Sequence, residues 1–507
     1  MPPALLEEWI AQGVTPQLAA LRSRSAYGRL SKSEDHPHEA SWSALLQGCA
    51  PRVSGEWGRQ VYDADTYRVE VRDAYSLEHQ PPFYALTNDI PLVIFDLPHV
   101  PIINSLMGVQ LLGWGLVENL SKCASRPNHL LTEIVQRHGM HPFFGGNAAR
   151  VIAQEHDGTV SGFRLPSVYD PEALDKLEEQ LISAIEQRTD ILLDLMARVP
   201  WAFVFAAVSE LHLAMHMLWH KPSRLTAIAR AFDISLGRML NVIPDDTYLA
   251  VFSISGMATD YTDLPTTLFL PEFLYRLQFG EPALAAGKMG ASVPTPATHY
   301  RKHWKNEVWA LRTARGTREL ESPDEQELRN DPFDWSPLNW YRVLWPRMRA
   351  FALPSFSHGM VRINLRGRDR AGIVEPADYA RYCDELTDAI WGLCNARSGR
   401  PIIKSIKRTR TSPNEDGENL PPADLMITWN PEEPTDTVES PLVGRIGPVP
   451  RMRTGGHVSD GFCMLNGSDI EPGAQLRRDA RVTDLTATLF KMLNIAPPPY
   501  LEGRSLI

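Results

Sequence analysis

The sequence predicts an α/β protein in which a mostly parallel sheet lies between layers of helices. Short runs that are apolar on both faces recur along the 507 residues, and such runs are typical of strands buried between helices. Longer stretches with apolar residues at three- and four-residue spacing separate these runs and indicate amphipathic helices. Strands that alternate with helices favour a mainly parallel sheet with right-handed crossovers.

Five apolar runs bounded by turn residues predict the buried strands. They are residues 90–98, 201–210, 247–255, 423–429 and 460–468. The helical pattern is clearest over 171–199, where Leu174, Leu177 and Leu181 follow one another at helical spacing. The same pattern predicts further helices over 225–243 and 379–396.

The alternation of strands and helices breaks down between residues 280 and 350. Charged residues dominate this stretch, and five tryptophans lie among them: Trp304, Trp309, Trp335, Trp340 and Trp345. An inserted helical layer whose tryptophans pack on the main domain accounts for this pattern. A cap that lines a substrate pocket accounts for it as well. We therefore expect an α/β core built from 1–279 and 351–507, with a cap-like helical region inserted at 280–350.

The composition excludes several classes of protein. The chain carries 51 Lys and Arg against 61 Asp and Glu, a net charge of −10, and this acidity disfavours binding to nucleic acid. Five scattered cysteines without CxxC spacing argue against a disulfide framework and a thiolate metal cluster. The longest apolar run, 201–208, is far too short to span a bilayer. We expect a cytoplasmic protein without a membrane partner, and its oligomeric state stays open.

Histidines follow the strand predicted at 201–210, on a helix. His212, His216 and His220 are spaced four residues apart, so that they project from one face about a turn apart. Two histidines at this spacing can chelate one zinc ion, although buried histidines often serve only in packing and hydrogen bonding. His220 precedes Lys-Pro and is the expected bystander. Glu210 is either a partner that fixes a histidine tautomer or an acid that interacts with the helix dipole.

A second junction supplies a third candidate ligand. His457 follows a Gly-Gly pair, which permits close approach of the backbone. Together with His212 and His216 it would give three protein ligands and an open position, as in catalytic zinc sites. Arg453 nearby either neutralises an anionic substrate or is simply solvated. Ser255, after the strand at 247–255, either binds substrate or acts as a nucleophile, or lies in a plain turn.

Several segments together resemble the alkaline phosphatase superfamily, in its type I phosphodiesterase/nucleotide pyrophosphatase-like branch. The C-terminal run RTGGHVSDGFCMLNGSDIEPG looks like the RTG-x-H motif and the glycine-rich strand of that branch, and it is followed by a matching helix and tail. FSHGMVRINLRGRDRAGIV, SWSALLQGCAPRVSGEW and SELHLAMHMLWH resemble three further motifs. The resemblance spans nearly the whole chain, and it implies an alkaline-phosphatase-like fold.

The resemblance implies two metal sites, of which this chain matches one. His212, His216 and His457 stand at the ligand positions of the first site. The S-D-H-G-like turn that supplies ligands to the second reads Ser253-Ile254-Ser255-Gly256, and the N-terminal strand with its Asp ligand has no counterpart before the first helix. The resemblance therefore implies a degenerate second site.

The position of the usual threonine nucleophile is also changed. Four residues before Trp42 the chain has His38, flanked by His36 and Glu39. His38 or Glu39 is a candidate general base, and His38 is also a candidate fourth ligand or nucleophile. An exposed polar loop is the alternative interpretation of these residues.

The resemblance therefore implies a metal-dependent hydrolase with a single zinc or other divalent ion, acting on a small anionic ester such as a phosphoester, phosphodiester or sulfoester. One ion can lower the pKa of bound water toward about 7 and polarise a phosphoryl oxygen. The alternative interpretation of the lost second site is a catalytically impaired pseudoenzyme that binds a ligand or partner, or a group transferase in a specialised biosynthetic pathway. The sequence alone leaves open whether the chain is an enzyme.

Overall fold

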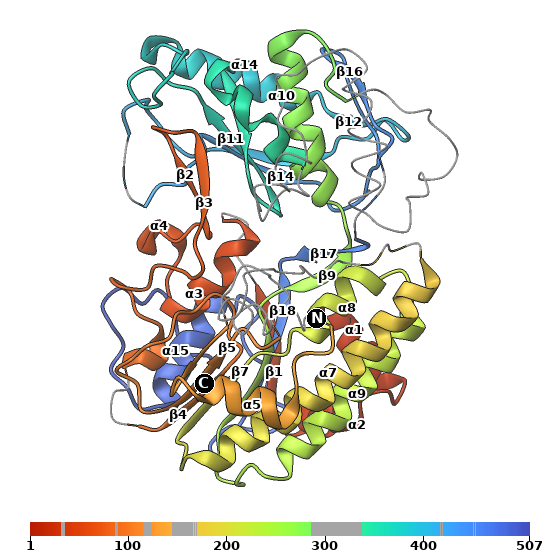
Figure 1. Cartoon of the computed structure of the whole chain (residues 1–507), viewed down its shortest axis with the longest axis vertical. Coiled ribbons are helices and arrows are strands. Elements are labelled where there is room, and N and C mark those ends of the chain that lie inside the picture. Colours follow the sequence, from red (N-terminus) through yellow and green to blue (C-terminus); the bar gives the residue numbers. More distant parts are fainter. Residues whose placement is uncertain are drawn as a thin grey trace.

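The protein has two lobes, one above the other in Figure 1. The structure, a computed structural model, describes residues 1–31, 36–86, 90–115, 123–143, 166, 168, 170–284, 337–415, 417, 419–449, 451 and 453–507. The lower lobe contains both ends of the chain, and the upper lobe is built mainly from its third quarter and the start of its fourth.

A four-stranded sheet forms one half of the lower lobe. Strand β4 (Leu92–Phe95) is completely buried and pairs in parallel with β5 (Gly108–Leu112) and β7 (Phe203–Ala206). Strand β6 (Ala124–Arg126) closes the far edge in the antiparallel direction. The run LVIF is apolar on both faces because helices cover both sides of this sheet, as its pattern predicts.

A three-stranded antiparallel sheet continues the lower lobe. Strand β18 (Asp460–Asn466) lies between β1 (Ala26–Ser31) and β8 (Leu249–Ser253). The rings of Phe205 on β7 and Phe252 on β8 lie 6.2 Å apart, so the two sheets adjoin at this point. Among the described strands, the parallel pairing that the sequence predicts is confined to β4, β5 and β7.

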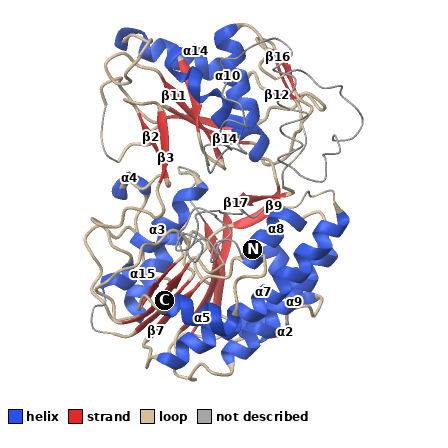
Figure 2. Ribbon diagram, in the orientation of Figure 1, coloured by secondary structure: helices blue, strands red, loops and turns tan. Residues whose placement is uncertain are grey.

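Helices flank these sheets on two sides (Figure 2). One side is covered by α1 (Pro3–Ala11), α2 (Pro16–Ser23), α7 (Pro171–Arg198), α8 (Glu210–Leu218) and α9 (Pro222–Leu240). The other side carries α3 (Ser41–Gln47) and α15 (Val482–Met492), which pack together. Helix α5 (Leu130–His138) packs on α7, and α4 (Pro51–Ser54) follows α3. The long amphipathic pattern at 171–199 thus forms one helix, whose first turn is capped by the carboxylate of Asp170.

The upper lobe is built on a second, antiparallel sheet. Its strands are ordered β10 (Ala350–Leu353), β11 (His358–Ile363), β14 (Leu425–Trp429) and β13 (Ile403–Arg408). Helices α10 (Leu270–Phe279) and α14 (Tyr379–Trp391) lie in the same lobe. A small sheet of β12 (Cys394–Asn395), β15 (Val438–Ser440) and β16 (Gly444–Ile446) and the hairpin of β2 (Gln60–Asp63) and β3 (Arg68–Val71) complete it.

Most of the predicted insertion, residues 285–336, lies outside the described residues, and so do Trp304, Trp309 and Trp335. The described end of the insertion forms 3₁₀ turns over Pro337–Arg347. Trp340 and Trp345 there are fully buried, and Trp345 stacks on Phe351 of β10 with ring centroids 4.8 Å apart. These two tryptophans therefore belong to the core of the upper lobe, and the boundary at 280–350 stays a prediction.

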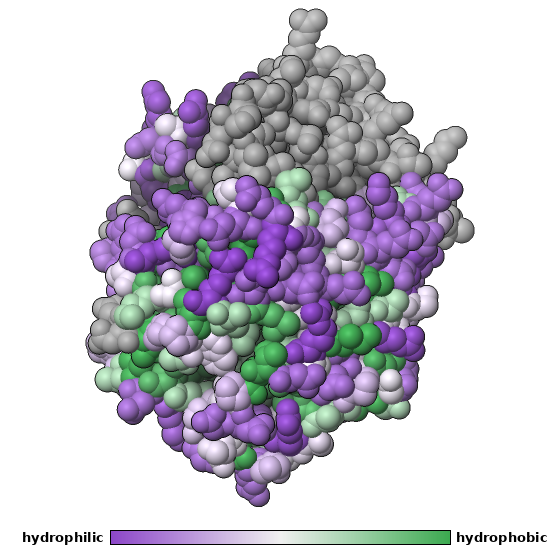
Figure 3. Space-filling model, turned by 60° about the horizontal axis from the view of Figure 1, so that its bottom comes forward, coloured by the Kyte–Doolittle hydropathy of each residue, from purple (hydrophilic) through white to green (hydrophobic). Residues whose placement is uncertain are grey.

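The surface of the lower lobe is mixed in character. Figure 3 shows hydrophobic residues scattered among hydrophilic ones on the face that comes forward there. Ile234 on α9 and Val242 just after it are among the exposed apolar side chains. Of the helices that the structure describes, none combines the length and apolar character that crossing a membrane requires.

Candidate metal centre

Three histidines from two elements converge between the lobes. His212 and His216 lie one turn apart on α8, and His457 lies on β17 (Gly455–Val458). The Nε2 atom of His212 is 2.9 Å from Nε2 of His216 and 3.0 Å from Nε2 of His457. The structure thus brings together the three predicted ligands, and their ligand atoms all lie within 4.8 Å of one another.

The donor set fits a tetrahedral metal ion with one open position. Zn–N bonds of 2.0–2.1 Å at tetrahedral angles place ligand nitrogens about 3.3 Å apart, close to the spacing found here. His216 donates its Nδ1 proton to the carbonyl oxygen of Gly455 at 2.7 Å, which leaves the lone pair of Nε2 free to bind an ion. Ser255 places its Oγ 3.3 Å from Nδ1 of His457 and can fix that ring in the same way.

The surroundings keep two of these histidines neutral. Burial lowers the pKa of His216 well below its usual value, and the positive charge of Arg453 lowers it further. Burial also lowers the pKa of His457 strongly, with His38 adding to the effect. Because metals bind the neutral imidazole, both side chains are ready to act as ligands at neutral pH.

The Gly-Gly pair before His457 permits the close packing that positions this ligand. Strand β17 pairs antiparallel with β9 (Gly256–Thr259) and lies against α8. A β-carbon on Gly455 would lie 2.1 Å from the carbonyl oxygen of Met215, and one on Gly456 would lie 2.5 Å from Oδ1 of Asp260. Glycine at 455 therefore lets β17 approach α8, and glycine at 456 lets β17 approach Asp260.

Two acidic residues that the sequence analysis did not single out stand beside the histidines. The guanidinium of Arg453 donates to both carboxylate oxygens of Asp263, and its Nη1 lies 3.4 Å from Nε2 of His216. Asp260 is buried nearby, and burial together with repulsion from Asp263 raises its pKa to about 7. Arg453 is thus held at the site by an ion pair. The sequence signal that could have found the two acidic residues is the pair of acids in the run ATDYTD, at the end of β9.

His38 lies against the predicted ligands, as its place in the motif suggests. It begins a 3₁₀ turn, His38–Ala40, and its ring stacks on His457 with centroids 3.6 Å apart and planes 19° apart. Its backbone N–H donates to Oγ of Ser357 in the upper lobe at 2.9 Å. His36 is buried. The alternative of an exposed polar loop is therefore wrong for these residues.

Glu39 faces the upper lobe. Its carboxylate accepts hydrogen bonds from Oγ of Ser355 at 3.0 Å, from Oγ of Ser357 at 3.1 Å and from the backbone N–H of Phe356. These three donors come from the turn between β10 and β11, so Glu39 ties the two lobes together beside His38.

Glu210 does not contact the ligand histidines, so the expectation that it fixes one of their tautomers is wrong. Its carboxylate accepts from Nε of Arg188 at 2.8 Å and lies 3.1 Å from Nε2 of His141, all within the buried interior. Arg188 also pairs with Asp96 at the end of β4. The side chain of Glu210 points into this network because Arg188 supplies the charge that a buried carboxylate needs. Glu210 therefore anchors the start of α8.

His220, the expected bystander, and the second metal site, which the sequence predicts to be degenerate, complete the comparison with the sequence. His220 is exposed, and its Nδ1 lies 3.1 Å from Oγ1 of Thr454, so it stands apart from the three ligands. Within the described part of the chain, the cluster of His212, His216 and His457 is the one group of His, Cys, Asp or Glu side chains with the geometry of a metal site.

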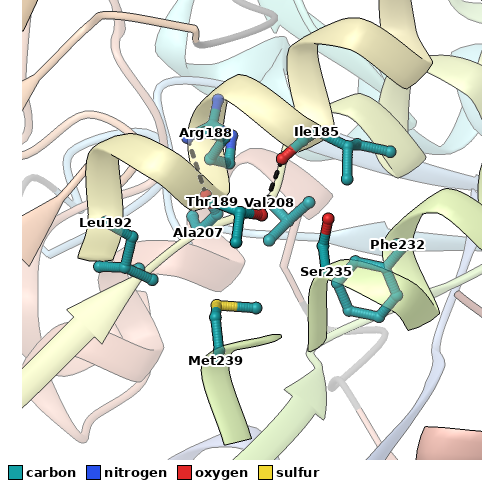
Figure 4. Close-up of a pocket in the computed structure, with 10 residues that line it drawn as sticks. Ile185, Arg188, Thr189, Leu192, Ala207, Val208, Phe232, Ser235 and Met239 are labelled. Carbon is teal, nitrogen blue, oxygen red and sulfur yellow. Dashed lines mark hydrogen bonds between the residues drawn. The ribbon is translucent and has the colours of Figure 1, made fainter. Parts of the chain in front are cut away.

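A small cavity lies elsewhere, between α7, α9 and the end of β7 (Figure 4). Its volume is about 20 Å³, enough for about one water molecule. Apolar side chains such as Leu192 and Met239 line it, and Thr189 uses its hydroxyl within α7. This cavity is too small for a substrate and holds none of the ligand histidines.

Comparison with known proteins bears on the fold. No family model matches the chain, and no curated protein matches it either. The solved structure of wild-type alkaline phosphatase PafA matches 98% of this chain and 95% of its own, with a TM-score of 0.52 and 10% identity. The chain has the alkaline phosphatase fold. Phosphonoacetate hydrolase from Sinorhizobium meliloti 1021, in complex with phosphonoformate, matches 98% of this chain and 94% of its own at a TM-score of 0.45 and 11% identity.

The α/β fold class predicted from the sequence is therefore confirmed. At such low identity the likeness concerns the fold alone. The nucleotide pyrophosphatase-like branch of the alkaline phosphatase superfamily stays a prediction, as do the roles of the site residues.

Proposed function

We propose that this chain is a metal-dependent hydrolase that acts on a phosphoester or related anionic ester with a single metal ion. The observation that carries the proposal is the convergence of three Nε2 atoms from His212, His216 and His457, two of them with a polar partner on Nδ1. Packing alone gives no reason for three imidazoles to meet nitrogen to nitrogen, whereas metal binding requires it. The printed names of the structural neighbours, alkaline phosphatase and phosphonoacetate hydrolase, agree with this class of reaction.

The residues around the cluster suit an anionic substrate. A divalent ion held by the three histidines, which we take to be zinc, polarises a phosphoryl oxygen and lowers the pKa of water. Arg453 reaches within 3.4 Å of Nε2 of His216 and can bind a second anionic oxygen. Its partner Asp263 holds the guanidinium in place until the substrate arrives. Ser255 lies behind His457, so we assign it to orienting this ligand in place of the substrate contact that the sequence suggested.

His38 is our candidate for the proton transfer. Its ring lies flat against His457, next to the atom that would bind the ion. There it can accept the proton of an attacking water as the bond from phosphorus to the leaving alcohol breaks, or attack phosphorus itself. We propose a positioning role for Glu39, because its carboxylate already accepts three hydrogen bonds from the 355–357 turn.

A cytoplasmic location agrees with the cysteines. All five are free thiols, and four of them are buried. Free buried thiols are usual in a reducing compartment.

A binding protein without activity, or a group transferase, is the second candidate. It is favoured by the turn Ser253–Gly256, which carries none of the acidic or histidine ligands expected of a second metal site. Turnover therefore has to be tested separately from metal content.

Metal analysis of purified protein, with substrate assays, tests the proposal. Wild type should carry about one zinc ion per chain, His457→Ala should lose it, and the matched control His220→Ala should keep it, because His220 lies outside the cluster. Hydrolysis of a bis-aryl phosphate, an aryl phosphate or an aryl sulfate should follow the zinc content. Absence of metal from wild type would overturn the proposal, and bound zinc without turnover of any ester would favour the binding protein or transferase.

A further inference from the structure

A cavity of about 200 Å³ lies beside His38, at the junction of the lobes. Pro37 and Glu39, the two neighbours of His38 in the chain, both line it. Consecutive Cα atoms are about 3.8 Å apart, so the cavity begins within one residue of the imidazole that stacks on His457. The cavity therefore borders the segment that carries His38.

Three segments that are distant in sequence form the walls. The hairpin β2–β3 contributes Val61, Tyr62 and Val69, and the turn after β10 contributes Leu353 and Pro354. The third wall comes from the segment that precedes β14, through Leu420 and Pro422. Trp57 also lines the cavity and donates its indole N–H to the carbonyl oxygen of Asn419 at 3.0 Å. This bond links Trp57 to the segment that precedes β14.

The charged residues on the wall are bound to other protein groups. Arg72 pairs with both carboxylate oxygens of Glu56 at 3.1 and 2.9 Å. Arg59 donates to the carbonyl oxygens of Arg72 and Asp73 at 3.0 and 3.4 Å. The carboxylate of Glu39 accepts from the 355–357 turn. The cavity therefore offers its occupant mainly aliphatic and aromatic surface.

The size of the cavity limits its occupant to about one ring. A cavity of about 150 Å³ lined by apolar side chains holds benzene, and this one is moderately larger. A single aromatic ring with a small substituent, or a branched alkyl group of that size, fills it, whereas a nucleoside needs more room and more polar partners.

We propose that this cavity binds an apolar group, about the size of one substituted aromatic ring, that is attached to the anionic centre of the substrate. The inference rests on the proposed function, in which the anionic centre lies at His212, His216, His457 and Arg453. It deepens that function by naming the substrate class: small esters with one aryl or similarly sized apolar group.

Calorimetric titration of the zinc-loaded protein with phenylphosphonate and methylphosphonate tests the inference. Both probes carry the same anionic group, and only the first carries a ring. Wild type should bind phenylphosphonate at least tenfold more tightly. Val69→Phe and Val69→Trp fill the cavity from the inner face of the hairpin, so both should remove this preference and leave methylphosphonate binding unchanged. Glu70→Phe adds the same ring to the hairpin at an exposed position outside the wall, and it should bind like wild type.

The outcomes separate this inference from the proposed function. Equal affinity for the two probes in wild type, or a ring preference that survives in both filled variants, would overturn the cavity assignment while leaving the anion site intact. If neither phosphonate binds, the anion site fails, and saturation-transfer NMR with benzyl alcohol decides on the cavity alone. A signal that is lost in Val69→Phe supports the cavity, and absence of the signal from wild type refutes it.

Discussion

Two of the three candidate ligands have a defined polar neighbour behind them. Nδ1 of His216 donates to a backbone carbonyl, whereas Nδ1 of His457 depends on the hydroxyl of Ser255. Backbone partners cannot be removed by mutation, but a hydroxyl can. Ser255 is therefore the point at which the orientation of a ligand can be tested without touching the ligand.

We expect Ser255→Ala to weaken zinc binding about tenfold, because partners of ligand histidines typically contribute 10- to 100-fold to metal affinity. Competition with a chromophoric chelator measures the change. Ser253→Ala is the matched control, since the hydroxyl of Ser253 donates to the carbonyl oxygen of Ser255 and touches no histidine. Equal affinities of wild type and Ser255→Ala would show that His457 needs no such partner.

The buried carboxyl of Asp260 should make the stability of the fold depend on pH. Its pKa rises from 3.8 to about 7 in the folded chain, so between these values the folded state holds a proton that the unfolded chain has released. The contribution of Asp260 to the free energy of unfolding therefore falls as the pH rises through this window. Asn at this position cannot ionise and keeps an oxygen that can accept from the backbone N–H groups of Thr262 and Asp263.

Asp260→Asn should accordingly be more stable than wild type at about pH 8, by about 1–3 kcal/mol, and should match it near pH 4. Urea unfolding at the two pH values measures the difference. Asp263→Asn should behave differently and lose stability at about pH 8, because it breaks the ion pair with Arg453. A stability gain that is the same at both pH values would contradict the role of ionisation.

At the scale of elements, the candidate site lies at the contact between helix α8 and strand β17. Helix α8 carries two of the candidate ligands, and β17 carries the third where Gly455 lies against the helix. The short distance between the two elements, more than any single side chain, brings Nε2 of His457 to 3.0 Å from Nε2 of His212.

Gly455→Ala should widen the contact between α8 and β17. The new β-carbon would lie 2.1 Å from the carbonyl oxygen of Met215, so β17 has to move away from α8. We expect zinc affinity to fall at least tenfold and stability to fall by about 2 kcal/mol or more, as is usual when backbone atoms are forced apart. Metal titration and thermal unfolding measure both effects.

Gly237→Ala in α9 is the control for the size of the added group. Its β-carbon would meet only the flexible side chain of Gln17, and Ala is favoured over Gly within a helix by about 1 kcal/mol. This variant should bind zinc like wild type. Unchanged zinc affinity in Gly455→Ala would show that zinc binding does not require the short distance between α8 and β17.

Local patterns explain how much of the molecule could be predicted. The strands β4, β7, β8, β14 and β18 and the helices α7, α9 and α14 each carry their own periodicity, so their places in the chain were predictable. The spacing of His212 and His216 is local as well. By contrast, the pair of Arg453 with Asp263 joins residues 190 positions apart, and the bond from His38 to Ser357 joins residues 319 apart. No pattern within a segment predicts which distant segments meet.

At the scale of the whole molecule, the chain passes between the lobes next to the histidines. The chain enters the main part of the upper lobe after Asp260 and leaves it before Arg453, and both passages lie beside the three histidines. On the other side of the junction, Glu39 accepts three hydrogen bonds from the turn between β10 and β11. The relative position of the lobes therefore determines both the environment of His38 and the shape of the adjoining cavity.

Two substitutions of Glu39 separate a positioning role from general base catalysis. Glu39→Gln keeps an oxygen that can accept from Ser355 and Phe356 but cannot take up a proton, whereas Glu39→Ala removes the acceptor altogether. If Glu39 positions the lobes, the Gln variant should keep the proposed ester hydrolysis within about threefold of wild type, a loss of about 0.6 kcal/mol. The Ala variant should lose much more activity and show faster hydrogen exchange over residues 355–358.

Zinc content should stay unchanged in both variants, because Glu39 is outside the cluster of three histidines. If both variants instead lose activity equally, and the exchange of 355–358 stays as slow as in wild type, then Glu39 is the base and the lobes are held together without it.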